Sequence, residues 1–102
     1  MANLFIRSEV GPDGANLVED LRTVAALLGG IPKSDGGAGR ALKFPLARPG
    51  AAAIVWAAVR RFQRAQAGGG RLAVATGTVQ PGDATMRLLN VYCPHPVAPC
   101  EQ

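Results

Sequence analysis

The spacing of apolar residues near the start of the chain is that of an amphipathic helix. Apolar residues recur there at i, i+4, i+7 and i+11, and they are Leu17, Leu21, Val24 and Leu28. A stripe at this spacing covers one side of a helix and packs on a core. Asp13 is suited to cap the start of this helix, because its carboxylate can accept a backbone N–H of the first turn. Gly29 and Gly30 are predicted to end it.

A second helix is predicted between Pro49 and Ala67. At about 100° per residue its apolar side chains form one arc, and they are Ala51, Ile54, Val55, Ala58, Val59 and Phe62. The opposite arc holds three arginines, which are Arg60, Arg61 and Arg64. Trp56 lies at the boundary, one turn from Arg60, where a cation–π contact can form. The pattern therefore predicts a helix with a core face and a basic face, capped by a left-handed Gly68.

β-Strands are predicted in four other segments, the second and third of which alternate apolar and polar residues. These segments are residues 3–8, 41–46, 71–79 and 85–93. Pro45 confines the second strand to a sheet edge or to its own end. Between the last two strands, residues 80–83 predict a type II turn, since Pro81 presets φ and Gly82 tolerates a positive φ. We therefore expect the last two strands to form a hairpin.

The predicted order of elements is strand, helix, strand, helix, strand, strand. This order predicts an α/β (α+β) fold: a single two-layer domain, β-α-β-α-β-β, with a four-stranded mixed sheet and two helices on one face. We expect this domain to cover residues 1–93 and a Pro-rich C-terminal tail to cover residues 94–102. A chain of 102 residues has no room for a second core. Its thin, Ala-rich core favours a homodimer.

Positive charge is concentrated in the middle of the chain. The net charge is +4, and residues 36–82 contain seven basic residues and no acidic one. Such a segment favours an anionic partner, with a merely solvated basic face as the alternative. In nucleic-acid binding the basic side chains contact phosphates and the tryptophan stacks or packs. The candidate nucleic-acid-binding residues are Arg40, Lys43, Arg48, Trp56, Arg60, Arg61, Arg64 and Arg71.

The segment from Gly29 to Arg40 is rich in glycine but matches no nucleotide-binding motif. A P-loop requires glycine directly before Lys-Ser, whereas Pro32 precedes Lys33-Ser34 here. The glycines that follow do not fit G-x-G-x-x-G either. We therefore expect no cofactor. The composition favours a flexible surface loop, with a basic loop that becomes ordered on nucleic acid as the alternative.

Cys93, His95 and Cys100 form the pattern C-x-H-x4-C near the end of the chain. Thiolate and imidazole are zinc ligands, but a structural site needs four ligands and the chain has no other Cys or His. A Cys93–Cys100 disulfide is the second alternative, which a reducing cytoplasm disfavours. We expect no metal, and these three residues are the candidates if one binds.

Enzymes and membrane proteins are disfavoured. The single histidine lies in the Pro-rich segment and no pair of carboxylates stands out, so we expect no catalytic site. The longest apolar run, Ala51–Val59, is too short to span a bilayer. No charged segment followed by an apolar run marks a signal peptide. We expect a cytoplasmic protein that has no membrane partner.

The start and the end of the second predicted helix resemble the Alba-type nucleic-acid-binding fold, including its sporulation-protein S-like branch. The matching residues are Ala47-Arg48, the helix-opening Gly50, and Val59-Arg60-Arg61-Phe62. The predicted order of elements is similar to that fold as well. The resemblance implies a dimer that binds DNA or RNA backbones through a basic entry loop, here Lys43 and Arg48, and through a hairpin tip at residues 80–83.

Two functions of different classes are therefore expected. The first is a small basic protein that contacts the phosphate backbone of DNA or RNA without strong sequence specificity. The second is a protein-interaction module, such as a small inhibitor or adaptor, that binds an acidic protein through Trp56, Phe44 or Tyr92. Affinity that falls steeply with salt favours the first.

Overall fold

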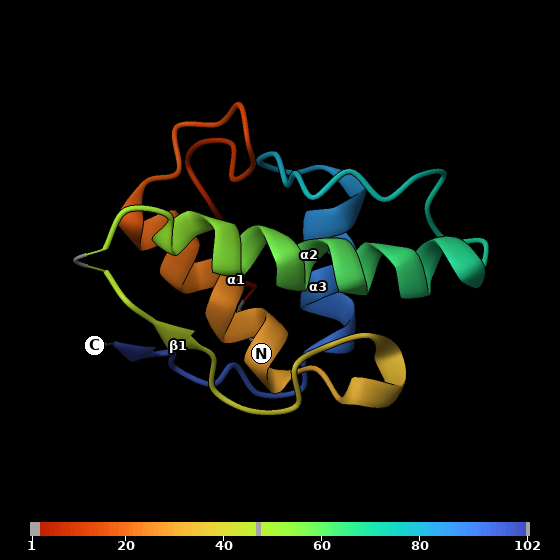
Figure 1. The fold of residues 1–102 in the computed structure, drawn as a ribbon. Coiled ribbons are helices and arrows are strands. Elements are labelled where there is room, and N and C mark those ends of the chain that lie inside the picture. Colours follow the sequence, from red (N-terminus) through yellow and green to blue (C-terminus); the bar gives the residue numbers. More distant parts are fainter. Residues whose placement is uncertain (1–2, 47, 102) are drawn as a thin grey trace.

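The computed structural model describes residues 3–46 and 48–101, and helices account for most of its regular structure. Helix α2 lies across α1 and α3, and a short two-stranded ribbon lies at one end of the molecule (Figure 1). The elements in chain order are α1 (Val18–Gly30), the 3-10 helix η1 (Lys33–Asp35), β1 (Lys43–Phe44), α2 (Ala51–Gly68), α3 (Ala84–Tyr92) and β2 (Cys100–Glu101). Among the described residues this is an α-rich small domain.

The predicted four-stranded mixed sheet is wrong. Within the described ranges, β1 and β2 form a two-stranded parallel ribbon in which Lys43 pairs with Cys100 and Phe44 with Glu101. The remaining strand-like pairing is one antiparallel bridge, in which Val10 and Val79 exchange backbone hydrogen bonds of 2.8 and 2.9 Å. The β-α-β-α-β-β order of an α/β (α+β) domain is therefore absent.

The predicted strand at residues 85–93 is helix α3, so the predicted hairpin is also wrong. Asp83 caps α3: its carboxylate accepts a hydrogen bond of 2.8 Å from the backbone N–H of Met86. The buried apolar side chains of α3 and its C-cap recur at helical spacing, and they are Met86, Leu89 and Cys93. The predicted turn at residues 80–83 is confirmed by the 3.1 Å bond from Asp83 N–H to the Gln80 carbonyl and by Gly82 at φ +72°. It leads from an extended segment into a helix.

The predicted strand at residues 3–8 is an extended segment without a strand partner. Its side chains alternate around Ile6, which is buried while its two neighbours are exposed. Its backbone bonds go to side chains instead: Leu4 exchanges bonds of 2.9 and 3.0 Å with the amide of Asn90. The Asp20 carboxylate accepts 3.0 Å bonds from the N–H groups of Arg7 and Ser8. Because partner side chains replace a neighbouring strand, no sheet forms.

Helix α1 confirms the first predicted helix, although its ends differ from the prediction. It begins at Val18, and Asp13 lies in a turn before it and does not cap it. Gly30 is the last residue of the helix. A Cβ on Gly30 would clash with the backbone oxygen of His95, so this glycine allows the C-terminal segment to lie against α1. The Val97 N–H donates a 2.9 Å bond to the Ala26 carbonyl in the same region.

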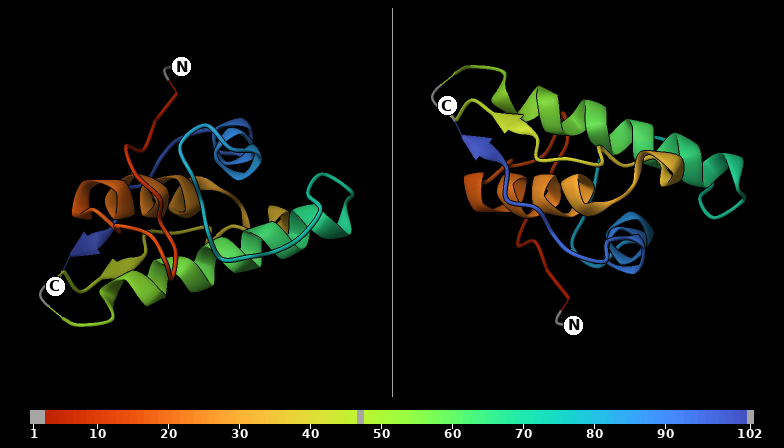
Figure 2. Two further views of the ribbon diagram at one scale, coloured as in Figure 1. Left: turned by 90° about the horizontal axis from the view of Figure 1, so that it is seen from above. Right: turned by 90° about the horizontal axis from the view of Figure 1, so that it is seen from below.

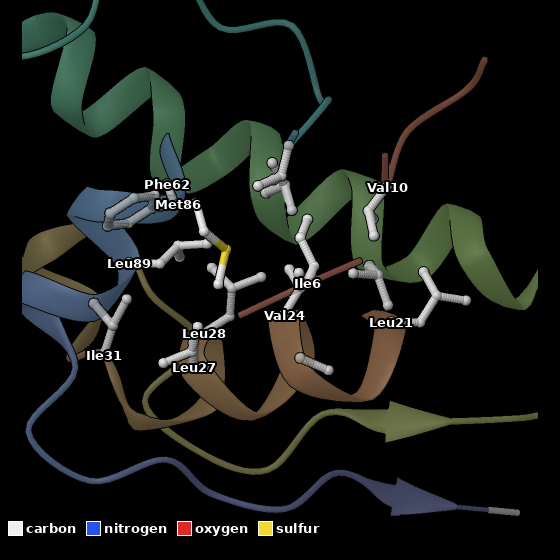
Figure 3. Packing of buried hydrophobic residues seen from close by; sticks show 14 of the residues in the cluster. Ile6, Val10, Leu21, Val24, Leu27, Leu28, Ile31, Phe62, Met86 and Leu89 are labelled. Atoms are coloured by element: carbon white, nitrogen blue, oxygen red, sulfur yellow. The ribbon is translucent and has the colours of Figure 1, made fainter. Parts of the chain in front are cut away.

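One apolar core joins the three helices and the extended segments. Figure 3 shows Ile6 and Val24 between α1 and α2, and Met86 beside Phe62. Burying one such side chain stabilises a fold by about 1.5–3 kcal/mol. The core consists of Ile6, Val10, Leu21, Val24, Ala25, Leu27, Leu28, Ile31, Phe44, Val55, Val59, Phe62, Val79, Met86, Leu89 and Cys93.

The glycine-rich segment after α1 is packed, in contrast to the flexible loop that its composition suggests. Gly36 adopts φ +89° and lies so close to α2 that a Cβ would come within 2.6 Å of the Ala65 Cβ. The N–H groups of residues 36–39 all donate to carbonyls of residues 28–33. They are therefore engaged within the fold and do not form an open cradle for phosphate.

Candidate nucleic-acid interface

Helix α2, at Ala51–Gly68, confirms the second predicted helix within two residues at its start and one at its end. Gly50, at φ +82°, is its N-cap, and Gly69, at φ −88°, is its C-cap, so the predicted left-handed Gly68 cap is wrong. Its buried side chains are Val55, Val59, Phe62, Gln63 and Gln66. At about 100° per residue, this arc is rotated by about 60° from the predicted one. Ile54 is accordingly 40% exposed.

The opposite side of α2 is exposed and basic. Arg60, Arg61 and Arg64 are all exposed, and the helix contains no acidic residue. The remaining exposed positions of this arc are small or apolar: Ala53, Ile54, Ala57 and Gly68. Within residues 3–46 and 48–101 the structure has one ion pair, which joins Arg22 of α1 and Glu101 of β2. The three arginines of α2 therefore have no carboxylate partner, and we call the exposed arc of α2 the basic face.

Surface hollows connect the basic face with residues from the β1 region. A hollow of about 480 Å³ is lined by Arg40, Lys43 and Ile54, among others. It shares Leu42 and Ile54 with a second hollow, of about 260 Å³, that Arg61 lines. Two candidate residues from the β1 region thus border the same run of surface as the helix arginines.

Trp56 lies on the other flank of the basic face and is half-buried. Its indole N–H donates a 2.9 Å bond to the Asn16 side-chain oxygen. It lines a hollow of about 240 Å³ together with Pro12, Arg60 and Gly77. The predicted cation–π contact between Trp56 and Arg60 is not found; the contact of this kind in the described residues joins Arg71 and Tyr92.

The remaining two basic candidates lie apart from the basic face or at its end. Arg71 bonds to the Gln66 side-chain oxygen at 2.5 Å, and its guanidinium carbon lies 5.6 Å from the centre of the Tyr92 ring. The Arg71 side chain is therefore engaged in contacts within the fold. Arg48 is exposed two residues before the N-cap of α2, and its N–H bonds to the Pro45 carbonyl at 3.0 Å.

The two buried glutamines of α2, Gln63 and Gln66, are not among the residues predicted from the sequence. The Gln63 side chain donates to the Thr78 carbonyl and the Thr85 hydroxyl, and it accepts from the N–H groups of Thr76 and Gly77, at 2.7–3.1 Å. The segment that was predicted as a strand at 71–79 is thereby held against α2, along which it returns toward α3 (Figure 2). Gln66 likewise donates to the Asp35 carbonyl at 3.0 Å. The only sequence signal is their helical spacing with Val59 and Phe62.

The candidate metal ligands Cys93, His95 and Cys100 lie in different environments. Cys93 is buried and Cys100 is exposed, and both are free thiols. Burial raises the pKa of the Cys93 thiol above its ordinary value, while a backbone hydrogen bond from His95 pulls it in the opposite direction. In the part of the chain that the structure describes, no three His, Cys, Asp or Glu side chains are grouped to hold a metal ion. Cys100 instead donates its N–H to the Leu42 carbonyl at 2.7 Å, beside the β1–β2 ribbon.

Comparison with protein-family models, with curated proteins and with solved structures finds no match for this chain. The similarity in strand order to the Alba-type fold is lost, because Ala84–Tyr92 form a helix and the described residues form no four-stranded sheet. Ala47, the first residue of the Alba-like motif, lies outside the described residues.

The helices of the described residues include none with the length and apolar character needed to cross a membrane.

Proposed function

We propose that this protein binds nucleic acid through the basic face of α2, contacting phosphates without strong sequence specificity. The observation that carries this proposal is that Arg60, Arg61 and Arg64 are exposed on one arc of a helix that has no acidic residue. Guanidinium groups suit phosphate because their donors form a planar fork. The proposal takes the protein to be cytoplasmic, as expected from its sequence.

The charge arrangement around α2 supports this proposal over a merely solvated surface. Within the described residues the ion pair is formed by Arg22 and Glu101, so no carboxylate there neutralises the arginines of α2. Arg40 and Lys43 extend the positive surface through the hollows beside Ile54. Five cationic side chains can thus meet one polyanion.

A binding titration against DNA and RNA of unrelated sequence, at several salt concentrations, tests the proposal. We expect similar affinities for unrelated sequences, and a slope of log affinity against log salt of about −0.7 to −0.9 for each phosphate contacted. Five contacts correspond to a slope of about −3.5 to −4.5. Polyglutamate of equal charge serves as the control polyanion, and we expect it to compete weakly. A flat salt dependence contradicts the proposal, and tight polyglutamate binding favours an acidic protein partner.

A further inference from the structure

We infer that the hollow beside Trp56 binds one unstacked nucleobase of a single strand whose phosphates lie on the basic face. This inference rests on the proposed function and names its ligand class. The hollow, of about 240 Å³, is lined by Pro12, Trp56, Ala57, Arg60, Thr76 and Gly77. It is smaller than the pockets of roughly 300–1,000 Å³ that hold drug-sized ligands, which suits a single planar ring system.

Trp56 is the one aromatic side chain placed to stack a base beside the basic face. The chain has five aromatic residues, and all lie in the described ranges. Phe44 and Phe62 are fully buried, and Tyr92 packs edge-on against Phe62 with the Arg71 guanidinium over its ring. Phe5 lines a different hollow, next to α3. A single tryptophan therefore provides one stacking position, and neighbouring nucleotides are held by their phosphates.

One wall of the hollow is fixed by Asn16. Its side-chain oxygen accepts bonds from the Trp56 indole N–H at 2.9 Å and from the Gly11 N–H at 3.0 Å. Its amide nitrogen donates to the carbonyls of Gly11 and Gly14 at 2.8 and 2.9 Å. Asn16 is also the non-glycine residue with a positive φ, +51°, among those described. An uncommon backbone conformation held by this many bonds fixes the position of the indole before any ligand arrives.

The opposite wall consists of Thr76 and Gly77, and Gln63 holds it in place. The Gln63 side-chain oxygen accepts bonds of 2.9 and 2.7 Å from the N–H groups of Thr76 and Gly77. A Cβ on Gly77 would come within about 4 Å of the Trp56 carbonyl and the Arg60 Nε, so it would occupy the hollow. The loops that form the two walls are joined by the Val10–Val79 bridge and meet alongside α2 (Figure 1). The hollow is thus preformed.

Arg60 connects this hollow to the basic face. Its exposed guanidinium lines the hollow, and Arg64 lies one turn further along the same arc of α2. A base stacked on Trp56 therefore has a cation within reach of its own phosphate, and the next phosphates meet Arg64 and Arg61. Aromatic stacking with an adjacent positive groove is how single strands are bound without sequence preference.

The test uses three labelled probes of twelve nucleotides: oligothymidylate, a strand of the same length with abasic sites throughout, and a DNA duplex. Oligouridylate is the RNA counterpart of the first. We expect both base-bearing strands to bind about 5- to 150-fold more tightly than the abasic strand, the range that one stacked base provides. Because Trp56 is the only tryptophan, its emission should be quenched by these strands and not by the abasic one.

A variant that fills the hollow separates stacking from phosphate contact. Ala57 is exposed and lines the hollow, so Ala57→Leu should preserve the fold while blocking the base. We expect it to lower the affinity for oligothymidylate to that for the abasic strand. Ala84→Leu, at an exposed helical position of α3 that lies outside the basic face and lines none of the hollows described above, is the matched control. It should leave both affinities unchanged.

Different binding results overturn this inference and the proposed function. Equal binding of oligothymidylate and the abasic strand, with unchanged Trp56 emission, overturns the base site while leaving phosphate binding intact. Tighter binding of the duplex than of either single strand does the same. Absence of binding to all probes at low salt overturns the proposed function, and the base site with it.

Discussion

The two sides of helix α2 both carry polar side chains, but their hydrogen-bond partners differ. On the buried side, the amides of Gln63 and Gln66 bond to backbone and side-chain groups of three other segments. On the exposed side, Arg60 and Arg64 have no carboxylate partner in the described residues. Every buried side-chain nitrogen and oxygen atom in the described residues has a hydrogen-bond partner.

This difference separates polar residues that hold the fold from polar residues that remain available to a ligand. A buried amide without partners costs about 1–3 kcal/mol, so Gln63 can exist in the core only because the loops fold around it. An exposed arginine has no such requirement, and its removal costs the fold little. Variants on the two sides of α2 should therefore separate stability from binding.

The largest expected effect is on the buried side. Gln63→Ala should lower the free energy of unfolding by about 2–4 kcal/mol, because four hydrogen bonds are lost and buried backbone groups are left without partners. Urea unfolding measures the change. Gln80→Ala is the control, since Gln80 is exposed and its side chain makes one bond, to Glu9. Unchanged stability of Gln63→Ala contradicts the account of the buried side.

Removing the N-cap of α3 is expected to have the next largest effect on stability. Asp83→Ala should cost about 1 kcal/mol, the usual cost of removing an N-cap carboxylate. Asp13→Ala should cost less than about 0.5 kcal/mol, because Asp13 is exposed and caps no helix. Thermal unfolding of the two variants makes the comparison. A greater loss from Asp13→Ala than from Asp83→Ala would contradict the positions of the two helix starts.

Arg71 and Arg64, both predicted to bind nucleic acid, are expected to have a smaller effect on stability. Arg71→Ala should lower the free energy of unfolding by about 0.5–1 kcal/mol, because its bond to Gln66 and its contact with Tyr92 are lost. Arg64→Ala should change it by less than about 0.5 kcal/mol. Denaturant titration of both variants is the measurement. Equal costs would mean that Arg71 is as free as the arginines of the basic face.

The helices α1 and α2 could be predicted because their apolar stripes are long and strongly periodic. Helix α3 could not be predicted, because the apolar residues within its nine positions are compatible with a short strand as well as with a helix. Its decisive signal was Asp83, which also fits a turn. The predicted strands at 3–8 and 71–79 failed for a different reason. Their backbone partners are the side chains of Asp20, Asn90 and Gln63, which come from distant positions that no local pattern indicates.

The candidate interface was predictable in part. The exposure of Arg60, Arg61 and Arg64 follows from the helical period alone. The period does not predict the contacts of Arg71 or the hollow beside Trp56. Both depend on loops that fold back onto α2. Charge counted along the sequence therefore indicated the helix that carries three exposed arginines, but it could not separate them from Arg71, whose side chain makes contacts within the fold.

The most direct test of the central claim compares the salt dependence of oligonucleotide binding in two triple variants. The first variant changes Arg60, Arg61 and Arg64 to alanine. The second changes Arg7, Arg22 and Arg87, which lie outside α2, so both variants lose the same charge. We predict that the slope of log affinity against log salt shrinks by about 2–3 in the first variant and by less than about 1 in the second. Equal loss of slope in both variants would show that net charge, and not the basic face of α2, determines binding.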